Sequence, residues 1–355
     1  MAFSPIRLLF SSSVCCVAIA PAASAAVLIG NTTGNNIVEF DETTGTFLGE
    51  FIAPFAGFES PDTLIYGPDG NLYISSGTSP DTSAVYRFDA DTGALIDQFA
   101  TGGGLFRPYG IAFGPDANLY VSSFLSDEIL RYDGTTGAFI DVFAAGDGSD
   151  PDGLNGPNGL LFGPDGSLYV TTQGSVAVNG APDFSFGFPS QVLRYDITTG
   201  EGTVFIPQPE PFPTSFGFVS FLGLVIGPED GNLYVSDFAN GLRSYDFASG
   251  TELQVFDTNY TGTNPSNNFI GSLAFGPDND LYTVGFDLTD DTNPGTLLRF
   301  DIDSSDRTLI ATEQPTLERP IGIVFRPASV PEPSLPAGLG VLGIAGGVWG
   351  HRKRR

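Results

Sequence analysis

The chain has 355 residues, is rich in glycine (46) and proline (27), and has only 15% charged residues. This length suits one large domain or two smaller ones, and the many turn-forming residues favour short β-strands. The formal net charge of -27 comes from 41 acidic against 14 basic residues, so the surface repels nucleic acid and anionic lipid and attracts cations. A nucleic-acid partner is therefore excluded, whereas a solvated acidic surface and a cation-binding surface both remain open.

Residues 1–25 have the three parts of a secretory signal peptide. Arg7 supplies a positive charge, residues 8–20 form an apolar run, and Ala23 and Ala25 provide the small-x-small cleavage site. Both cysteines of the chain lie inside this segment. We therefore expect a secreted mature protein without disulfides or thiol chemistry.

A unit made of two halves repeats along the body of the chain. The first half, for example "GIAFGPDANLYVSS" at 110, occurs five times, and the glycines of its turns are Gly67, Gly114, Gly163, Gly227 and Gly276. The second half, for example "ILRYDGTTGAFIDVF" at 129, occurs six times. Each unit contains four short β-rich segments separated by turns, which is the make-up of one β-propeller blade.

Incomplete units at the two ends of the repeat region predict how the ring closes. The segment "IGIVFRP" at 321–327 matches only the start of a unit, whereas "AVLIGN" at 26–31 and "NIVEFDETTGTFLGEF" at 36–51 match the remainder. Together they make one further blade, which hides the edges of both terminal strands. The sequence therefore predicts an all-β fold, a six-bladed propeller over residues 26–328 with four-stranded blades.

Aspartates recur in the two turns of every unit, and two roles are open for them. In Gly-Pro-Asp-Gly the proline and the aspartate occupy the positions that a type I turn favours. The "YDxTTG" segment ends in glycine, which takes a positive φ at low cost. We interpret these aspartates as turn formers first and as metal ligands second.

The segment "RPYGIAFGPDANLYVSS", followed by "ILRYD", resembles the NHL-repeat propellers. It is also similar to the six-bladed gluconolactonase/SMP-30 and streptogramin-lyase-like propellers. The resemblance implies the fold and leaves the function open, because such folds host many activities. The only histidine is His351 near the C-terminus, so histidine bases, triads and zinc sites are excluded from the propeller. Streptogramin-lyase chemistry, which relies on histidine, loses its support for the same reason.

The gluconolactonase resemblance implies metal ligands one residue before the glycine or its equivalent in each inner strand. "PNGLLFGPDG" resembles the family's asparagine segment, so Asn158 carries over, and Asp62 in "SPDTLIYGPDG" is a ligand type at the equivalent place. Tyr109 occupies the same position in its own unit. The other three positions offer no side-chain oxygen; they are Leu222, Gly271 and Ile321. Because calcium takes 6–8 oxygen ligands, we expect at most a weak calcium site and no lactone hydrolysis.

Two long segments predict further binding residues at one face of the propeller. Residues 171–190 account for a longer spacing between two units, and residues 208–221 follow one unit later. Both are rich in phenylalanine. The candidate ligand-binding residues are Phe184, Phe186, Phe188, Phe216 and Phe218, together with Tyr109 of the inner-strand ring. These rings form either a platform for sugars or another protein, or a plug in which they bury one another.

The C-terminal segment 329–355 has three parts in order. Pro331, Glu332 and Pro333 precede an uncharged run, 335–350, which a basic end follows. The run is shorter than the ~20 apolar residues of a stable membrane helix. The arrangement resembles the PEP-CTERM sorting signal of Gram-negative bacteria. It implies a transient inner-membrane stage, removal of the tail by an exosortase, and delivery to the outer surface or exopolysaccharide matrix; a plain tail anchor is the alternative.

Three classes of function fit these features. The favoured hypothesis is a secreted, surface- or matrix-associated propeller that binds a glycan, a cation or a protein without catalysis. The second is a metal-dependent hydrolase of the lactonase type. The third is a structural matrix component, bridged by calcium between its acidic surface and acidic polysaccharide.

Overall fold

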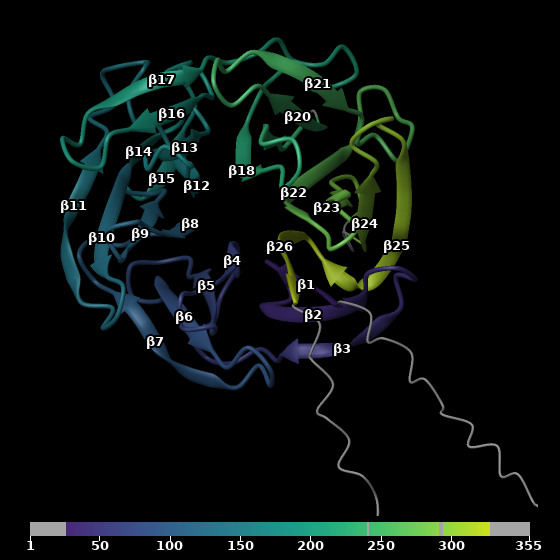
Figure 1. Cartoon of the computed structure of the whole chain (residues 1–355), viewed down its shortest axis with the longest axis horizontal. Coiled ribbons are helices and arrows are strands. Elements are labelled where there is room, and N and C mark those ends of the chain that lie inside the picture. Colours follow the sequence, from purple (N-terminus) through teal and green to yellow (C-terminus); the bar gives the residue numbers. More distant parts are fainter. Residues whose placement is uncertain (1–25, 240, 291–293, 327–355) are drawn as a thin grey trace, which may run out of the picture. The chain divides into compact units, whose positions relative to one another are not determined.

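The structure, a computed structural model, describes residues 26–239, 241–290 and 294–326. They form six antiparallel sheets of four strands each, arranged as blades around a common axis (Figure 1). This confirms the predicted six-bladed β-propeller. No described residue belongs to a helix long and apolar enough to cross a membrane. The predicted signal peptide and the sorting segment lie outside the described residues.

Blade 1 joins the two ends of the described chain. Its inner strand β26 (Pro320–Arg326) pairs with β1 (Ala26–Asn31), followed outward by β2 (Asn36–Asp41) and β3 (Phe47–Ile52). Val27 lies opposite Phe325 and Ile29 opposite Ile323. The predicted closure by N- and C-terminal strands is therefore confirmed (Figure 1).

The other five blades are continuous in sequence and run from the inner strand to the outer one. Blade 2 contains β4 (Leu64–Tyr66), β5 (Leu72–Ser76), β6 (Ala84–Phe88) and β7 (Leu95–Thr101). Blade 3 contains β8 (Pro108–Phe113), β9 (Asn118–Ser123), β10 (Glu128–Asp133) and β11 (Phe139–Ala145). Blade 4 contains β12 (Pro157–Phe162), β13 (Leu168–Thr172), β16 (Val192–Tyr195) and β17 (Gly202–Ile206).

Blades 5 and 6 complete the ring. Blade 5 contains β18 (Phe221–Ile226), β19 (Leu233–Asp237), β20 (Gly241–Tyr245) and β21 (Glu252–Phe256). Blade 6 contains β22 (Asn268–Phe275), β23 (Leu281–Asp287), β24 (Pro294–Phe300) and β25 (Arg307–Glu318). The long segment of blade 4, interpreted from sequence only as a loop, holds a small hairpin of β14 (Val176–Val178) and β15 (Ala181–Asp183).

The hydrophobic core lies between neighbouring blades. Between blades 2 and 3, Tyr73 and Val85 pack in one cluster with Ile111 and Leu119, and none is more than 1% exposed. Both faces of the middle strands are covered in this way, because each blade stacks on the next. The second strands are therefore buried along almost their whole length instead of on alternate residues.

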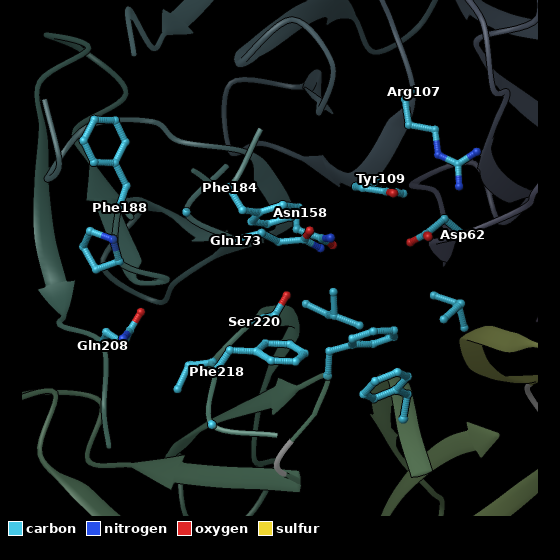
Figure 2. A pocket seen from close by; sticks show the side chains of 18 of the residues that line it. Asp62, Arg107, Tyr109, Asn158, Gln173, Phe184, Phe188, Gln208, Phe218 and Ser220 are labelled. Carbon is cyan, nitrogen blue, oxygen red and sulfur yellow. The ribbon is translucent and has the colours of Figure 1, made fainter. Parts of the chain in front are cut away.

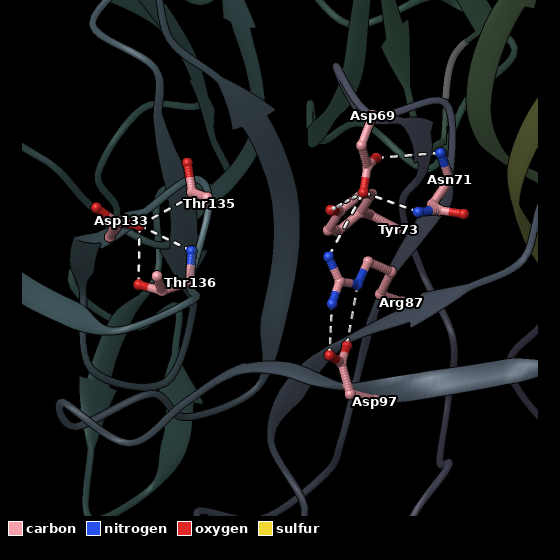
Figure 3. A network of polar contacts seen from close by, with 8 residues as sticks. All are labelled: Asp69, Asn71, Tyr73, Arg87, Asp97, Asp133, Thr135 and Thr136. Atoms are coloured by element: carbon pink, nitrogen blue, oxygen red, sulfur yellow. Dashed lines mark hydrogen bonds and ion pairs between the residues drawn. The ribbon is translucent and has the colours of Figure 1, made fainter.

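The aspartates of the Gly-Pro-Asp turns form local hydrogen bonds, as their interpretation as turn formers requires. Asp69 accepts the N–H of Asn71 at 3.1 Å and the hydroxyl of Tyr73 at 3.0 Å (Figure 3). Arg87 lies 3.5 Å from Asp69 and 2.6 Å from Asp97. The turn, the second strand and the third strand of the blade are thus tied together by one carboxylate.

The aspartates of the second turn are used locally as well. Asp133 accepts the backbone N–H groups of Thr135 and Thr136 at 3.1 and 2.7 Å, and the Thr136 hydroxyl at 2.8 Å (Figure 3). Equivalent bonds to a threonine or serine three residues on are made by Asp41, Asp89, Asp196, Asp246 and Asp301. These contacts support the interpretation of both sets of aspartates as turn formers.

Candidate functional site

The inner strands of blades 3 to 6 each contain a β-bulge near the predicted ring position. In β8, Pro108 lies opposite Ser123, but Ile111 lies opposite Val121, so one extra residue sits between these pairs. Blades 4, 5 and 6 have the same shift. An extra residue bends the strand and re-aims its side chains, and the bulges contain the positions of Tyr109 and its equivalents.

Glycine is required at the bulge because the next blade comes very close. A Cβ on Gly110 would lie 2.2 Å from the carbonyl oxygen of Asn158. A side-chain hydroxyl closes the gap: Ser122 Oγ accepts the N–H of Gly110 at 2.7 Å and donates to the Asn158 carbonyl at 2.7 Å. Ser75 and Thr171 likewise donate to the carbonyls of Tyr109 and Leu222 in the following blades. The inner strands of blades 3, 4 and 5 are thus each joined to the preceding blade by a hydroxyl.

Most of the ring positions predicted from sequence lie together in one pocket of about 770 Å³ (Figure 2). The predicted residues that line it are Asp62, Tyr109, Asn158, Leu222 and Ile321. Gly271 does not line it. The pocket lies at the face built from the connections between blades and between the second and third strands.

One side of the pocket is aromatic. Phe184 and Phe188 come from the long connection of blade 4 and Phe218 from the segment before blade 5, and all three line the pocket. Phe238 and Phe269 complete this side, stacked with their ring centroids 4.4 Å apart. Phe184 is 54% and Phe218 42% exposed, so these two rings form an open platform and are not a plug.

The remaining two predicted phenylalanines lie beside the pocket without lining it. Phe186 contacts Phe188, with ring centroids 5.7 Å apart, and Phe216 contacts Phe269 at 5.9 Å. Phe186 is 47% and Phe216 46% exposed. Both therefore enlarge the exposed aromatic surface next to the pocket.

The opposite side of the pocket is charged. Asp62 is 7% exposed, and the guanidinium of Arg107 lies over the ring of Tyr109 at 5.3 Å (Figure 2). Burial raises the pKa of Asp62 to about 7, although Arg107 and Arg319 act to lower it. Burial raises the pKa of Tyr109 as well. This carboxyl is therefore readily protonated near neutral pH.

The donor set does not fit the calcium ion that the gluconolactonase resemblance implies. Asp62 is the only carboxylate among the lining residues, and two arginines act on it electrostatically. Among the described residues no group of three or more histidines, cysteines, aspartates and glutamates is placed to hold a metal. A divalent cation between two guanidinium groups would be repelled at close range. Asp62 and Asn158 thus share a pocket without forming a calcium cradle.

Several polar residues of the pocket were not identified from the sequence. They are Thr32, Arg107, Gln173, Gln208, Ser220 and Arg319. Arg107, Ser220 and Arg319 stand two residues before the ring positions Tyr109, Leu222 and Ile321. Extending the comparison of repeats by two residues would have found these three, whereas Gln173 and Gln208 lie in segments that do not repeat.

Comparison with known proteins supports the architecture. No family model matches the chain, and no curated protein matches it. A chain of a nidogen/laminin complex is similar with a TM-score of 0.58 and 15% identity, covering 85% of this chain and 98% of that one. A protein of unknown function from Bacteroides caccae has a TM-score of 0.56 and 12% identity, covering 86% and 100%.

A third solved structure is virginiamycin B lyase from Staphylococcus aureus, with a TM-score of 0.52 and 16% identity, covering 86% of this chain and 90% of that one. Such likenesses show the fold alone. They agree with the predicted propeller and assign no activity.

Proposed function

We propose that this protein is a non-catalytic binding propeller whose pocket takes a sugar unit of a glycan. The observation that carries this proposal is an open aromatic platform facing amide and hydroxyl groups in one pocket of about 770 Å³. Sugar rings have apolar C–H faces that pack on aromatic rings, and hydroxyls that pair with amide side chains. A concave, mostly apolar pocket with a few convergent polar groups is the usual form of a small-ligand site.

The polar groups are suitably placed for this chemistry. Gln173 and Gln208 line the same pocket as Phe184 and Phe218, and Ser220 lies next to the platform (Figure 2). Each amide offers both donors and acceptors, which matches the dual character of a sugar hydroxyl. The lactonase hypothesis receives no comparable support, because the residues around Asp62 do not fit the metal it requires.

The location that we propose is the outer surface or the exopolysaccharide matrix of a Gram-negative bacterium. Its support is the N-terminal signal pattern and the C-terminal resemblance to a sorting signal, with an exosortase as transient partner. Intact mass of the secreted protein tests this location. A secreted species that still ends at Arg355 would contradict removal of the tail.

Binding to a panel of bacterial polysaccharides and their oligosaccharides, measured by isothermal titration calorimetry, tests the binding function. We expect Phe218→Ala and Gln173→Ala to weaken binding roughly tenfold, since stacking and buried hydrogen bonds contribute about 1–3 kcal/mol each. Phe139 is 41% exposed on β11, far along the chain from the platform, and Phe139→Ala is the matched control.

The same titration separates the rival functions. Glycan binding that persists in EDTA supports binding in the pocket. Glycan binding that requires calcium and is unchanged in Phe218→Ala indicates a calcium-bridged matrix component. If the protein binds a protein partner tightly and binds no glycan, the ligand class is a protein and the glycan proposal is wrong.

A further inference from the structure

Two arginines at the pocket are held without an ion pair in a strongly acidic protein. Within the described residues, Arg107 and Arg319 have no carboxylate within 4.0 Å, and Arg307 on the outer strand β25 is the third such arginine. The other arginines of the propeller are all ion-paired: Arg87, Arg131, Arg194, Arg243, Arg299 and Arg326. Both pocket arginines therefore retain their capacity to bind an anion.

The contacts of these two arginines leave their charge unsatisfied. Arg107 donates to the hydroxyl of Ser60 at 3.0 Å and lies over Tyr109. Arg319 lies over the ring of Phe286 at 5.5 Å. Hydroxyls and rings position a guanidinium without neutralising it, and a guanidinium prefers the paired oxygens of a carboxylate.

A second cavity of about 460 Å³ shares both arginines with the first. It is polar, and hydroxyl and amide side chains line most of it; they are Thr32, Thr33, Asn35, Ser60 and Thr78. Glu59 is its only carboxylate, and it accepts hydrogen bonds from the hydroxyls of Thr78 at 2.6 Å and Thr82 at 3.0 Å. The two arginines thus stand between an aromatic cavity and a hydroxyl-rich one.

The backbone at both arginines is in a conformation that disfavours arginine. Arg107 has φ 57° and Arg319 φ 53°, in the left-handed region where side chains other than glycine are sterically strained. Blade 4 has Gly156, φ 65°, at the equivalent position two residues before Asn158. Glycine would relieve this strain at Arg107 and Arg319, so their side chains are maintained at a cost in stability, as strained residues at binding sites often are.

We propose that the ligand is an acidic polysaccharide strand, with the carboxylate of a uronic acid unit held between Arg107 and Arg319. Its neighbouring sugars extend over the phenylalanine platform on one side and into the hydroxyl-lined cavity on the other. This assignment rests on the proposed glycan-binding function and specifies its substrate class. The negative charge of the remaining surface repels such a chain elsewhere, so the arginines also fix where it binds.

The buried carboxyl in the pocket is compatible with this ligand. Asp62 is the only acid among the residues lining the aromatic cavity, and burial raises its pKa to about 7. Protonation of Asp62 removes the like charge next to the incoming carboxylate, whereas a uronate itself stays ionised down to far lower pH. Arg107, Arg319 and Tyr109 are the charged or titratable groups that act on it.

The test is calorimetric binding of oligosaccharides of galacturonate, glucuronate, alginate and hyaluronan to the mature protein. Methyl-esterified galacturonate oligosaccharides and neutral oligosaccharides serve as uncharged probes. A sulfated oligosaccharide serves as a probe whose anionic group is tetrahedral and not planar like a carboxylate. We expect the acid to bind at least tenfold more tightly than its ester, and Arg319→Gly and Arg107→Gly to remove this difference. Arg307→Ala makes the same change of net charge away from the pocket and is expected to have no effect.

Melting temperature provides the second readout. Because glycine relieves the positive φ, Arg319→Gly is expected to melt no lower than the parent while it loses the acidic ligand. Arg319→Gln and Arg107→Gln keep the strained positive φ but remove the charge, so they too are expected to lose binding of the acidic oligosaccharide. A loss of binding that only accompanies unfolding would contradict a role of the charge.

Other outcomes of the binding experiment would contradict the uronate assignment or the glycan-binding function. Equal binding of acid and ester, exclusive binding of the sulfated probe, or an equal loss in Arg307→Ala overturns the uronate assignment. Binding of a neutral glycan that depends on Phe218 and not on the arginines overturns it as well, but leaves the glycan-binding function standing. If no oligosaccharide of any class binds, both proposals fail.

Discussion

Asp62 is the residue at which burial and charge act in opposite directions. Its pKa of about 7 lies well above the value of ~3.9 expected in the unfolded chain. Between these values the folded state binds more protons than the unfolded state, so the free energy of unfolding falls as pH rises from about 4 to 7. Above pH 7 Asp62 is ionised in the folded state, and the cost of burying its charge lowers the free energy of unfolding in full.

The substitution Asp62→Asn tests this balance, because asparagine resembles the protonated carboxyl. We expect the variant to be more stable than the parent at pH 8, and the difference to vanish below about pH 4. Urea unfolding at several pH values measures it. Asp81 is exposed, and Asp81→Asn serves as the control of equal charge; parallel stability curves for Asp62→Asn and the parent would contradict the prediction.

Ala117 is a second residue whose environment is unfavourable. It has φ 64° in the turn "GPDANLY", where two other units have glycine at the same place. Ala117→Gly is therefore expected to raise the free energy of unfolding by about 1 kcal/mol. Gly166 is the matched control, since a Cβ there would meet nothing within 4 Å; Gly166→Ala should cost a similar amount. Thermal unfolding of both variants measures these changes. A lower melting temperature for Ala117→Gly than for the parent would contradict the prediction.

At the scale of elements, turns and strands follow from short sequence patterns. The aspartates of both turn types bind N–H groups only two or three residues on, so a local pattern is sufficient to predict them. The β14–β15 hairpin had such a signal too. Asn179 and Gly180, with φ 52° and 76°, form the Asn-Gly pair typical of a two-residue hairpin turn.

The hydroxyl that joins the second strand of blades 2, 3 and 4 to the next blade is the element-scale feature that the sequence did not reveal. Ser122 satisfies the bulged N–H of Gly110 and the carbonyl of Asn158 in the next blade. Ser122→Ala leaves both buried groups without their partner, so we expect a loss of about 1–3 kcal/mol. Thr135→Ala, at an exposed turn position, is the control and is expected to change little. An unchanged denaturation midpoint for Ser122→Ala would show that the joint between blades is not stabilised by this hydroxyl.

The whole molecule depends on one strand for closure. Strand β26 supplies Ile321 and Ile323, which are 8% and 5% exposed, and it covers the edge of β1. A chain ending at Arg319 loses both side chains, about 3–6 kcal/mol of burial, and leaves an open edge. We expect cooperative thermal unfolding to be lost. A chain ending at Arg326 is the control, expected to melt like the parent; similar melting of the two truncated chains would contradict closure by β26.

Fold and site differ in how far the sequence predicts them. Repeats recur in register along the chain, so counting them was sufficient for six blades, for the closing strand, and for Asp62, Tyr109 and Asn158 as neighbours around one axis. Residue types alone also suggested a cation site at Asp62. The arginines that contradict it come from other blades, and no local pattern reports that they act on this carboxyl.

The sequence by itself therefore determined the architecture of this protein, because blade size, turn chemistry and strand pattern are set by residues close together in the chain. Only the tertiary structure decided the character of the pocket. Asp62 and Arg319 lie almost at opposite ends of the described chain, and the ring brings their charges together. Burial, the absence of a carboxylate within 4.0 Å of the two pocket arginines, and the openness of the phenylalanine platform are properties of such long-range contacts, which periodicity in sequence does not encode.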